Sequence, residues 1–277
     1  MSLPMLRRLL IAPLLLTLAL PAAAGSWGEQ WDALPKERKL LYTNAGMAAF
    51  ITLWGVTQWD YFQSSPKTSS EGWFGQDTSE GGADKLGHAY TSHLLTNILA
   101  SKYHKWGYET DQAGLYGALS AFGVQAFMEV GDSFSGKYGF SYEDFIANGV
   151  GALYGYYYWR YPALAEKVDF RIEYAPTFEN GDVFTDYEHH KYLLAFKFSG
   201  VDRIKDTPLR FLELHGGYYA RGYDDRIAAN ERRQLYVGIG LNLSELAESA
   251  SLPRLSTFFK FYQTPYTYVS TRHRLGD

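Results

Sequence analysis

Three polar motifs stand between residues 84 and 148: Asp84-Lys-Leu-Gly-His88, Glu129-Val-Gly-Asp132 and Ser141-Tyr-Glu-Asp144-Phe-Ile-Ala-Asn148. The sequence around each motif is largely uncharged and rich in aromatic residues, as in segments that pack in a core or contact lipid. Ionisable groups are costly in such surroundings unless they pair, bind a ligand or reach water. We therefore expect the chemistry of this protein to lie among these motifs.

Segments that lack Asp, Glu, Lys and Arg predict four helices, at residues 40–59, 86–101, 112–128 and 145–159. Only the first approaches the roughly 20 residues that cross a bilayer, and all contain Gly, Thr, Gln or Asn. We expect a compact bundle, partly embedded in a membrane; the alternative is an inner-membrane protein with four spans. Five glycines would let the helices approach closely: Gly114, Gly117, Gly123, Gly151 and Gly155.

After Pro162 the sequence alternates with a period of two, which predicts an antiparallel meander of five to six strands. The predicted strands are residues 168–174, 191–198, 209–221, 234–243 and 255–262, with 266–271 as a sixth. One face is apolar and aromatic and the other small or polar, as in outer-membrane barrel segments. Because a single-chain barrel needs about eight strands, we favour a sheet packed on the bundle or on the membrane surface. The fold class is α+β.

The spacing of the motifs resembles that of the YfiM-like family of predicted periplasmic proteins, a bacterial domain of unknown function. The resemblance covers residues 80–157 and implies an envelope location and a helical core. A looser pattern, Asp-Lys-x-x-His followed by Glu and Asp-x-x-x-Asn, is similar to VanZ-like membrane proteins. YfiM-like proteins are typically lipoproteins, whereas this sequence contains no cysteine to acylate.

The N-terminal sequence and the composition also favour an envelope protein. Residues 1–24 combine Arg7-Arg8, an apolar run and Ala22-Ala-Ala24, which predicts a cleaved signal peptide. We expect a helical region at 25–163 and a β region at 164–277. The 23 Tyr and 7 Trp suit a membrane interface, and a net charge of −4 without a basic block argues against a nucleic-acid partner. Membrane or envelope lipid is the expected partner, and no protein partner is indicated.

Each polar residue has an ordinary interpretation beside a functional one. Asp84 either caps a helix, with Lys85 solvated, or orients His88 from one turn away. Ser141 and Asp144 fit a capping box, which does not account for Asn148. Glu129 and Asp132 oppose the dipole at a helix C-terminus and need compensation. The groups available for this are Lys85, His88, Lys137 and a cation.

A loop at residues 63–82 leads into Asp84 and is expected to cover the cluster. Two functions remain open. In the first, a structural or binding role, the cluster locks the helices of an exported, outer-membrane-associated or periplasmic protein. In the second, it is the site of an enzyme acting on a lipid or glycan headgroup, by acid–base chemistry or through a divalent metal ion. The candidate catalytic and metal-binding residues are Asp84, His88, Glu129 and Asp132, and the further binding residues are Lys85, Asp144 and Asn148.

Overall fold

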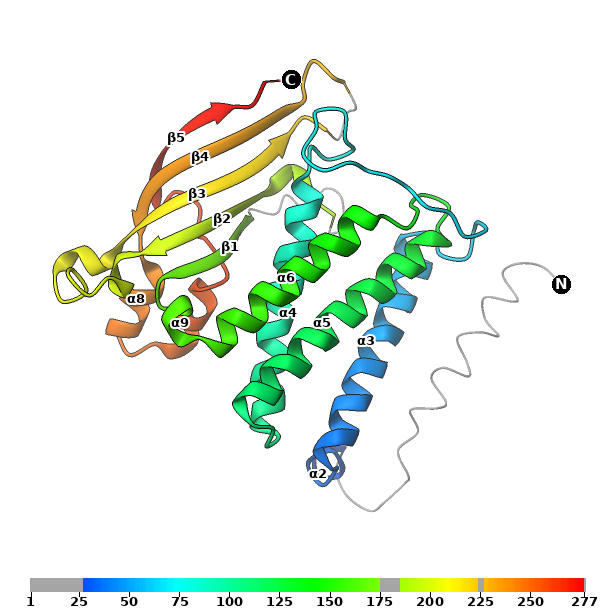
Figure 1. The fold of residues 1–277 in the computed structure, drawn as a ribbon, viewed down its shortest axis with the longest axis horizontal. Coiled ribbons are helices and arrows are strands. Elements are labelled where there is room, and N and C mark those ends of the chain that lie inside the picture. Colours follow the sequence, from blue (N-terminus) through cyan, green and yellow to red (C-terminus); the bar gives the residue numbers. More distant parts are fainter. Residues whose placement is uncertain (1–26, 175–184, 224–226, 277) are drawn as a thin grey trace.

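The computed structural model describes residues 27–174, 185–223 and 227–276. The predicted signal peptide and its cleavage site lie outside the described residues. The described chain forms a helical bundle followed by an antiparallel sheet (Figure 1). The predicted α+β fold is therefore confirmed.

The bundle consists of α3 (Lys36–Gln58), α4 (Ala83–Lys105), α5 (Thr110–Ser133) and α6 (Tyr142–Arg160). The short helix α2 (Trp27–Asp32) precedes it, and α7 (Pro162–Ala165) follows it. All four predicted helices are present, and each begins earlier than its uncharged segment because its first turn carries charged residues. Acidic residues near a helix N-terminus are favoured by the helix dipole. Helix α4 packs against both α5 and α6 and is the central element.

Glycines set the close approach of α4 to its two neighbours. A Cβ on Gly151 would lie 2.0 Å from the carbonyl oxygen of Ala89, and one on Gly117 would lie 2.7 Å from that of Thr96. No such contact surrounds Gly123, where a Cβ would meet nothing within 4 Å. The prediction of close helix packing thus holds for Gly117 and Gly151 but is wrong for Gly123.

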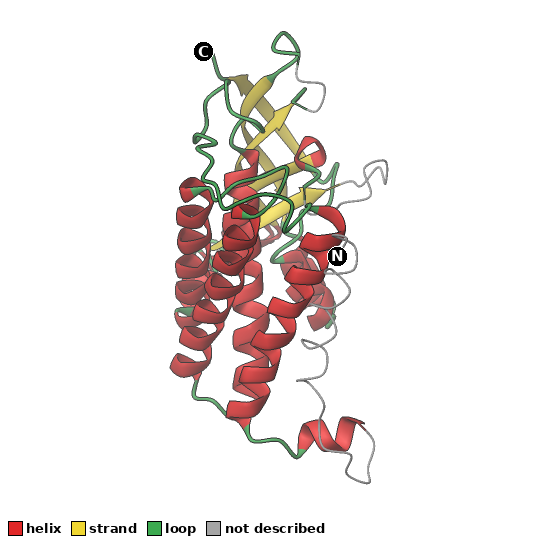
Figure 2. Cartoon of the chain, turned by 90° about the vertical axis from the view of Figure 1, so that its right-hand side faces the viewer, coloured by secondary structure: helices red, strands yellow, loops and turns green. Residues whose placement is uncertain are grey.

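The sheet contains five strands in chain order, each antiparallel to the next. They are β1 (Val168–Tyr174), β2 (His190–Lys197), β3 (Leu212–Arg221), β4 (Arg232–Leu241) and β5 (Tyr268–Arg274). Figure 2 shows the sheet at one end of the molecule, with the helices of the bundle extending away from it. The predicted meander is confirmed, and β5 is the strand predicted as the sixth.

The prediction of a strand at residues 255–262 is wrong. This part of the chain forms α9 (Pro253–Phe259), which follows another short helix, α8 (Leu243–Ser249). Asn242 ends β4 by capping α8, since its side chain accepts a hydrogen bond from the backbone N–H of Glu245 at 3.1 Å. Pro253 starts α9 at a position where proline is favoured. Short apolar runs do not separate strand from helix by periodicity, which explains the error.

Two further strand ends differ from the prediction because of short 3-10 turns. Strand β3 begins at Leu212 rather than at residue 209, since Pro208–Phe211 forms such a turn. Strand β2 ends at Lys197, and Phe198–Gly200 turns away from the sheet. Proline and the capping hydroxyl of Thr207 favour the first turn locally.

The free edge of β1 is covered by the segment between α9 and β5. Ile172 donates its backbone N–H to the carbonyl of Phe261 at 3.1 Å and accepts from the N–H of Gln263 at 2.8 Å. The hydroxyl of Tyr268, in β5, donates to the Glu173 carboxylate of β1 at 2.6 Å. The sheet is therefore curled, so that its first and last strands meet across one face.

That enclosed face is the polar one. In β1 the charged residues Asp169, Arg171 and Glu173 are buried, whereas the apolar residues between them are half-buried. The apolar face points outward. The register of the strands aligns four of its exposed side chains in one row across β2 to β5, namely Phe196, Leu214, Ile239 and Val269.

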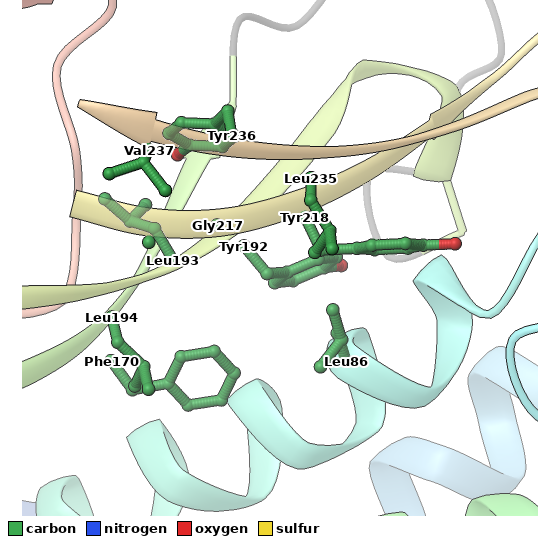
Figure 3. A pocket seen from close by; sticks show the side chains of 11 residues that line it. Leu86, Phe170, Tyr192, Leu193, Leu194, Gly217, Tyr218, Leu235, Tyr236 and Val237 are labelled. Atoms are coloured by element: carbon green, nitrogen blue, oxygen red, sulfur yellow. The ribbon is translucent and has the colours of Figure 1, made fainter. Parts of the chain in front are cut away.

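Helix α4 covers part of the outward apolar face. Ala83 and Tyr90 of this helix share a buried cluster with Tyr192, Ala220 and Tyr223 from the sheet region. Between the helix and the sheet is a hollow of about 330 Å³ whose lining is almost entirely apolar (Figure 3). The bundle and the sheet therefore share one core at this point.

Candidate functional site: a buried polar cluster

Lys85 lies at the centre of a group of carboxylates contributed by three segments of the chain. Its side chain is 2% exposed, and its Nζ lies 2.6 Å from Asp84, 2.9 Å from Asp144 and 2.9 Å from Glu71. Burial alone would lower the pKa of Lys85, but the three carboxylates outweigh it and raise the pKa. The interpretation of Lys85 as a solvated residue is therefore wrong.

Asp84 pairs with Lys85 and has neither of the two roles expected for it. Helix α4 is preceded by Gly82, whose φ of +80° favours glycine, and no side chain caps the helix there. The Asp84 carboxylate accepts from the Lys85 backbone N–H at 2.9 Å and forms an ion pair with the Lys85 ammonium. Its position in the first turn also suits the helix dipole. Asp84 is thus neither the cap nor the group that orients His88.

The loop predicted to cover the cluster does so and contributes to it. Glu71 reaches Lys85 from this loop, and Ser70 donates its hydroxyl to Glu143 at 2.8 Å. The backbone N–H of Gly72 donates to the same carboxylate of Glu143 at 3.1 Å. Glu71 and Glu143 belong to this candidate site but were not predicted from the sequence. The signal for Glu71 was its place as an acidic residue in a loop expected to lie over a charged site.

His88 is held by Asn148 across the interface of α4 and α6. The imidazole Nδ1 lies 3.2 Å from the Oδ1 of Asn148, which also accepts from Ser92 at 3.2 Å and Gln125 at 3.1 Å. An amide oxygen only accepts, so this contact places the proton of a neutral imidazole on Nδ1. The Nε2 atom then carries the lone pair, and it lies 3.7 Å from the Oδ1 of Asp144.

Glu129 completes the cluster from α5. It is 1% exposed, and its Oε1 lies 3.6 Å from His88 Nδ1 without a hydrogen-bond partner among the described residues. Burial, together with the charges of Asp144 and Asp132, raises the pKa of Glu129 to about 9. Protonation therefore supplies the compensation that a carboxylate near a helix C-terminus requires.

The structure brings together six of the seven predicted residues, and Asp132 is the exception. Asp132 faces Tyr61, whose hydroxyl also donates to the carbonyl of Met128 at 3.0 Å. Burial raises the pKa of Asp132 to about 7. Lys137 does not compensate it, because its ammonium pairs with Asp60 at 3.4 Å in an exposed position. Ser141 caps α6 as predicted, accepting from the Asp144 N–H at 3.2 Å.

The cluster carries more acidic groups than basic ones. Lys85 is the one lysine or arginine among the described residues that pairs with its carboxylates, and it contacts three of them: Glu71, Asp84 and Asp144. A fourth, Glu129, lies beside His88 instead. Burial and the charge of Asp144 raise the pKa of Glu71 to about 7. Burial would also raise the pKa of Asp144, but His88 and Lys85 hold it below its ordinary value. Without a bound cation, the negative excess is relieved by protons on Glu71 and Glu129.

A second buried charge cluster, inside the curled sheet, was not predicted. The Arg171 guanidinium contacts Glu213 at 2.6 and 2.9 Å, Asp169 at 2.6 Å and Gln263 at 3.0 Å. Lys197 pairs with Asp169 at 2.7 Å, and His215 contacts Glu213 at 2.7 Å. The alternation of charge in β1 was the available signal, but alternation does not tell which face is enclosed.

The fold and its cluster define an α+β protein in which three helices and a covering loop enclose a carboxylate-rich site. Residues 70–160 match the family model described as "Predicted periplasmic lipoprotein (DUF2279)". The match includes residues 70–82 of the covering loop and every residue of the cluster, and it agrees with an exported, periplasmic domain of unknown function. No curated protein and no solved structure matches the chain.

Proposed function

We propose that this protein is an outer-membrane-associated envelope protein that embeds apolar surface in lipid and has a non-catalytic role. The polar cluster locks its three central helices together beneath the covering loop. The kinship suggested by its motifs is with YfiM-like proteins. One observation carries the proposal: charged groups lie inside the molecule, and large apolar side chains lie outside.

The sheet shows this arrangement, with charged groups inside and apolar side chains outside, most clearly. The outward row is 43% exposed at Phe196, 39% at Leu214 and 55% at Ile239. On the opposite, enclosed face Arg171 is 1% exposed. An exposed apolar patch of this kind marks an interaction surface in a soluble setting, and a lipid environment removes its cost.

The helices repeat the pattern on their outer faces. Helix α5 exposes Leu115, Leu119, Phe127 and Val130, and α6 exposes Ile146, Val150 and Leu153. Helix α3 is the one helix of the described chain that is long and apolar enough to cross a membrane, and 6% of its most apolar window is buried. A helix with so little contact to the rest of the protein is stabilised by another apolar environment.

The matched family is described as lipoproteins, whereas the printed sequence has no cysteine that a lipid could modify. Apolar side chains then replace an acyl chain as the means of attachment. Burying one such side chain contributes about 1.5–3 kcal/mol, so a few residues of the outward row match a covalent anchor. Export combined with this attachment supports a location at an envelope membrane, and we infer that this membrane is the outer one.

Fractionation of bacterial envelopes tests the proposal. We expect the unmutated protein to remain with outer membranes after washing with alkaline carbonate. Leu214→Lys combined with Ile239→Lys should shift it to the soluble fraction, because both changes place charge on the outward row. The matched control, Asp206→Lys with Ala229→Lys in exposed turns, should remain membrane-bound. Release of the unmutated protein by salt or carbonate would refute embedding.

A further inference from the structure

Two groups of three ligand atoms share Asp144. Glu71, Asp84 and Asp144 form the first, and His88, Glu129 and Asp144 form the second. In each group one ligand atom per residue lies within 4.8 Å of the other two. The first group already surrounds a cation, because the Lys85 ammonium lies within 2.9 Å of all three carboxylates.

In the second group, the Lys85 ammonium contacts Asp144 alone, and no ammonium or guanidinium group among the described residues pairs with Glu129. Its three side chains come from α4, α5 and α6, and two of them are almost fully buried. The Oε1 of Glu129 points toward His88 and lacks a hydrogen-bond partner in the described structure. A buried carboxylate oxygen without a partner carries a large desolvation cost. The arrangement therefore lacks a positively charged group at this point.

We propose that His88, Glu129 and Asp144 bind one divalent transition-metal ion. An imidazole nitrogen with two carboxylate oxygens suits ions such as Zn²⁺ or Mn²⁺ better than Ca²⁺ or Mg²⁺, which prefer oxygen alone. Two carboxylates balance the charge of the ion. Metal–ligand bonds of about 2.1 Å in a tetrahedron separate the ligand atoms by about 3.4 Å. The 3.7 Å between His88 Nε2 and Asp144 Oδ1 requires only a small adjustment, whereas Glu129 Oε1, which lies 3.6 Å from His88 Nδ1, must turn toward the Nε2 side of the ring.

Asn148 is the positioning residue of this site. Its Oδ1 accepts from His88 Nδ1, which leaves Nε2 free to bind the metal. Ser92 and Gln125 donate to the same oxygen and fix its direction. Metal-bound histidines usually donate their other ring N–H to such an acceptor, and loss of that acceptor costs about 10–100-fold in affinity.

The inference goes beyond membrane attachment and does not depend on it, because the site lies inside the bundle. It can be tested with the full chain in detergent micelles, whatever the result of fractionation. After treatment with EDTA, the protein is titrated with Zn²⁺ and Mn²⁺, with Mg²⁺ and Ca²⁺ as comparison ions. We expect one transition-metal ion per chain and a rise in the melting temperature that Mg²⁺ and Ca²⁺ do not give.

Variants locate the ion. Glu129→Gln and His88→Gln should abolish the rise, and the matched exposed controls Glu109→Gln and His104→Gln should keep it. Asn148→Leu should weaken zinc binding about 10–100-fold, whereas Asn148→Asp, which keeps the acceptor oxygen, should retain it. Absence of binding to the folded unmutated protein would overturn the proposal. An equal rise in folded Glu129→Gln would also overturn it, since the ion would then bind elsewhere.

Discussion

The protein contains two buried charge clusters, one between the helices and one inside the sheet, and they differ in balance. In the sheet, Arg171 and Lys197 face Asp169 and Glu213, so two positive groups meet two negative ones. Between the helices, one lysine pairs with three carboxyl groups, and a fourth, that of Glu129, pairs with no lysine or arginine among the described residues. Both regions therefore bury charged groups, but only the helical cluster has more negative groups than positive ones.

The geometry of the two clusters leads to the same distinction. The guanidinium of Arg171 forms a two-point contact with Glu213, the geometry that gives strong and specific ion pairs. Both clusters contain buried atoms without a hydrogen-bond partner in the described part of the chain. In the sheet cluster these are the nitrogens Arg171 Nε and His215 Nδ1, whereas in the helical cluster they include the carboxylate oxygen Oε1 of Glu129. We interpret the sheet cluster as structural and the helical cluster as a site for a ligand.

The largest effect is expected from breaking the balanced cluster. Arg171→Ala should lower the free energy of unfolding by about 3–5 kcal/mol, because it leaves Asp169 and Glu213 buried without their main partner. Chemical denaturation in detergent measures this change. Lys205→Ala is the control; it removes an exposed ion pair with Asp202 and should leave the midpoint unchanged. Similar midpoints for the two variants would show that the sheet cluster does not stabilise the fold.

A matched pair of Glu→Gln substitutions sharpens the comparison. Without metal, Glu129→Gln should stabilise the protein at pH 7 by about 1–3 kcal/mol, whereas Glu213→Gln should destabilise it by weakening its pairing with Arg171. The sign for Glu129 follows from its raised pKa. Folding requires the uptake of a proton between the ordinary pKa of 4.5 and the folded value of about 9. The gain should therefore vanish as the pH falls to 4.5. Unfolding curves at pH 4.5 and 7 test this.

A smaller effect concerns His93, which lies between the two clusters. Its ring packs against Tyr154, Tyr158, Phe170 and Phe261, and burial lowers its pKa to about 3. The unfolded chain binds a proton below pH 6.5, while the folded state stays neutral down to about pH 3. The free energy of unfolding should therefore fall by about 1 kcal/mol for each pH unit by which the solution is acidified between pH 6.5 and 3.

His93→Gln should flatten this part of the pH profile, and His273→Gln, at an exposed position in β5, should leave it unchanged. The measurement is the free energy of unfolding between pH 4 and 7. An unaltered slope in folded His93→Gln would mean that other groups cause the acid sensitivity.

Much of the fold could be predicted because uncharged helical segments and alternating strands are local patterns. The errors occurred where two patterns compete, as in the apolar run at residues 255–262, or where a cap such as Asn242 ends a strand. Which face of the sheet is enclosed was not predictable, because alternation is symmetric. The buried face became clear only when Gln263 and Tyr268 were seen to meet β1.

The location of the candidate site was predicted from the sequence, but the partners of its charged side chains were not. Helical spacing placed His88, Glu129 and Asn148 correctly, because each lies on an inward helix face. It could not show that Asp84 pairs with its neighbour Lys85, since side-chain direction in the first turn depends on the covering loop. Glu71 reaches the cluster from that loop, where spacing carries no information.

The claim that excess negative charge marks a metal site is tested most directly by counting bound ions. Native mass spectrometry of the full chain, released from detergent after incubation with Zn²⁺, gives the number of ions per molecule. We predict one ion on the unmutated protein and on Glu109→Gln, and none on Glu129→Gln at the same zinc concentration. Equal occupancy of the unmutated protein and folded Glu129→Gln, or no zinc on either, would contradict the account.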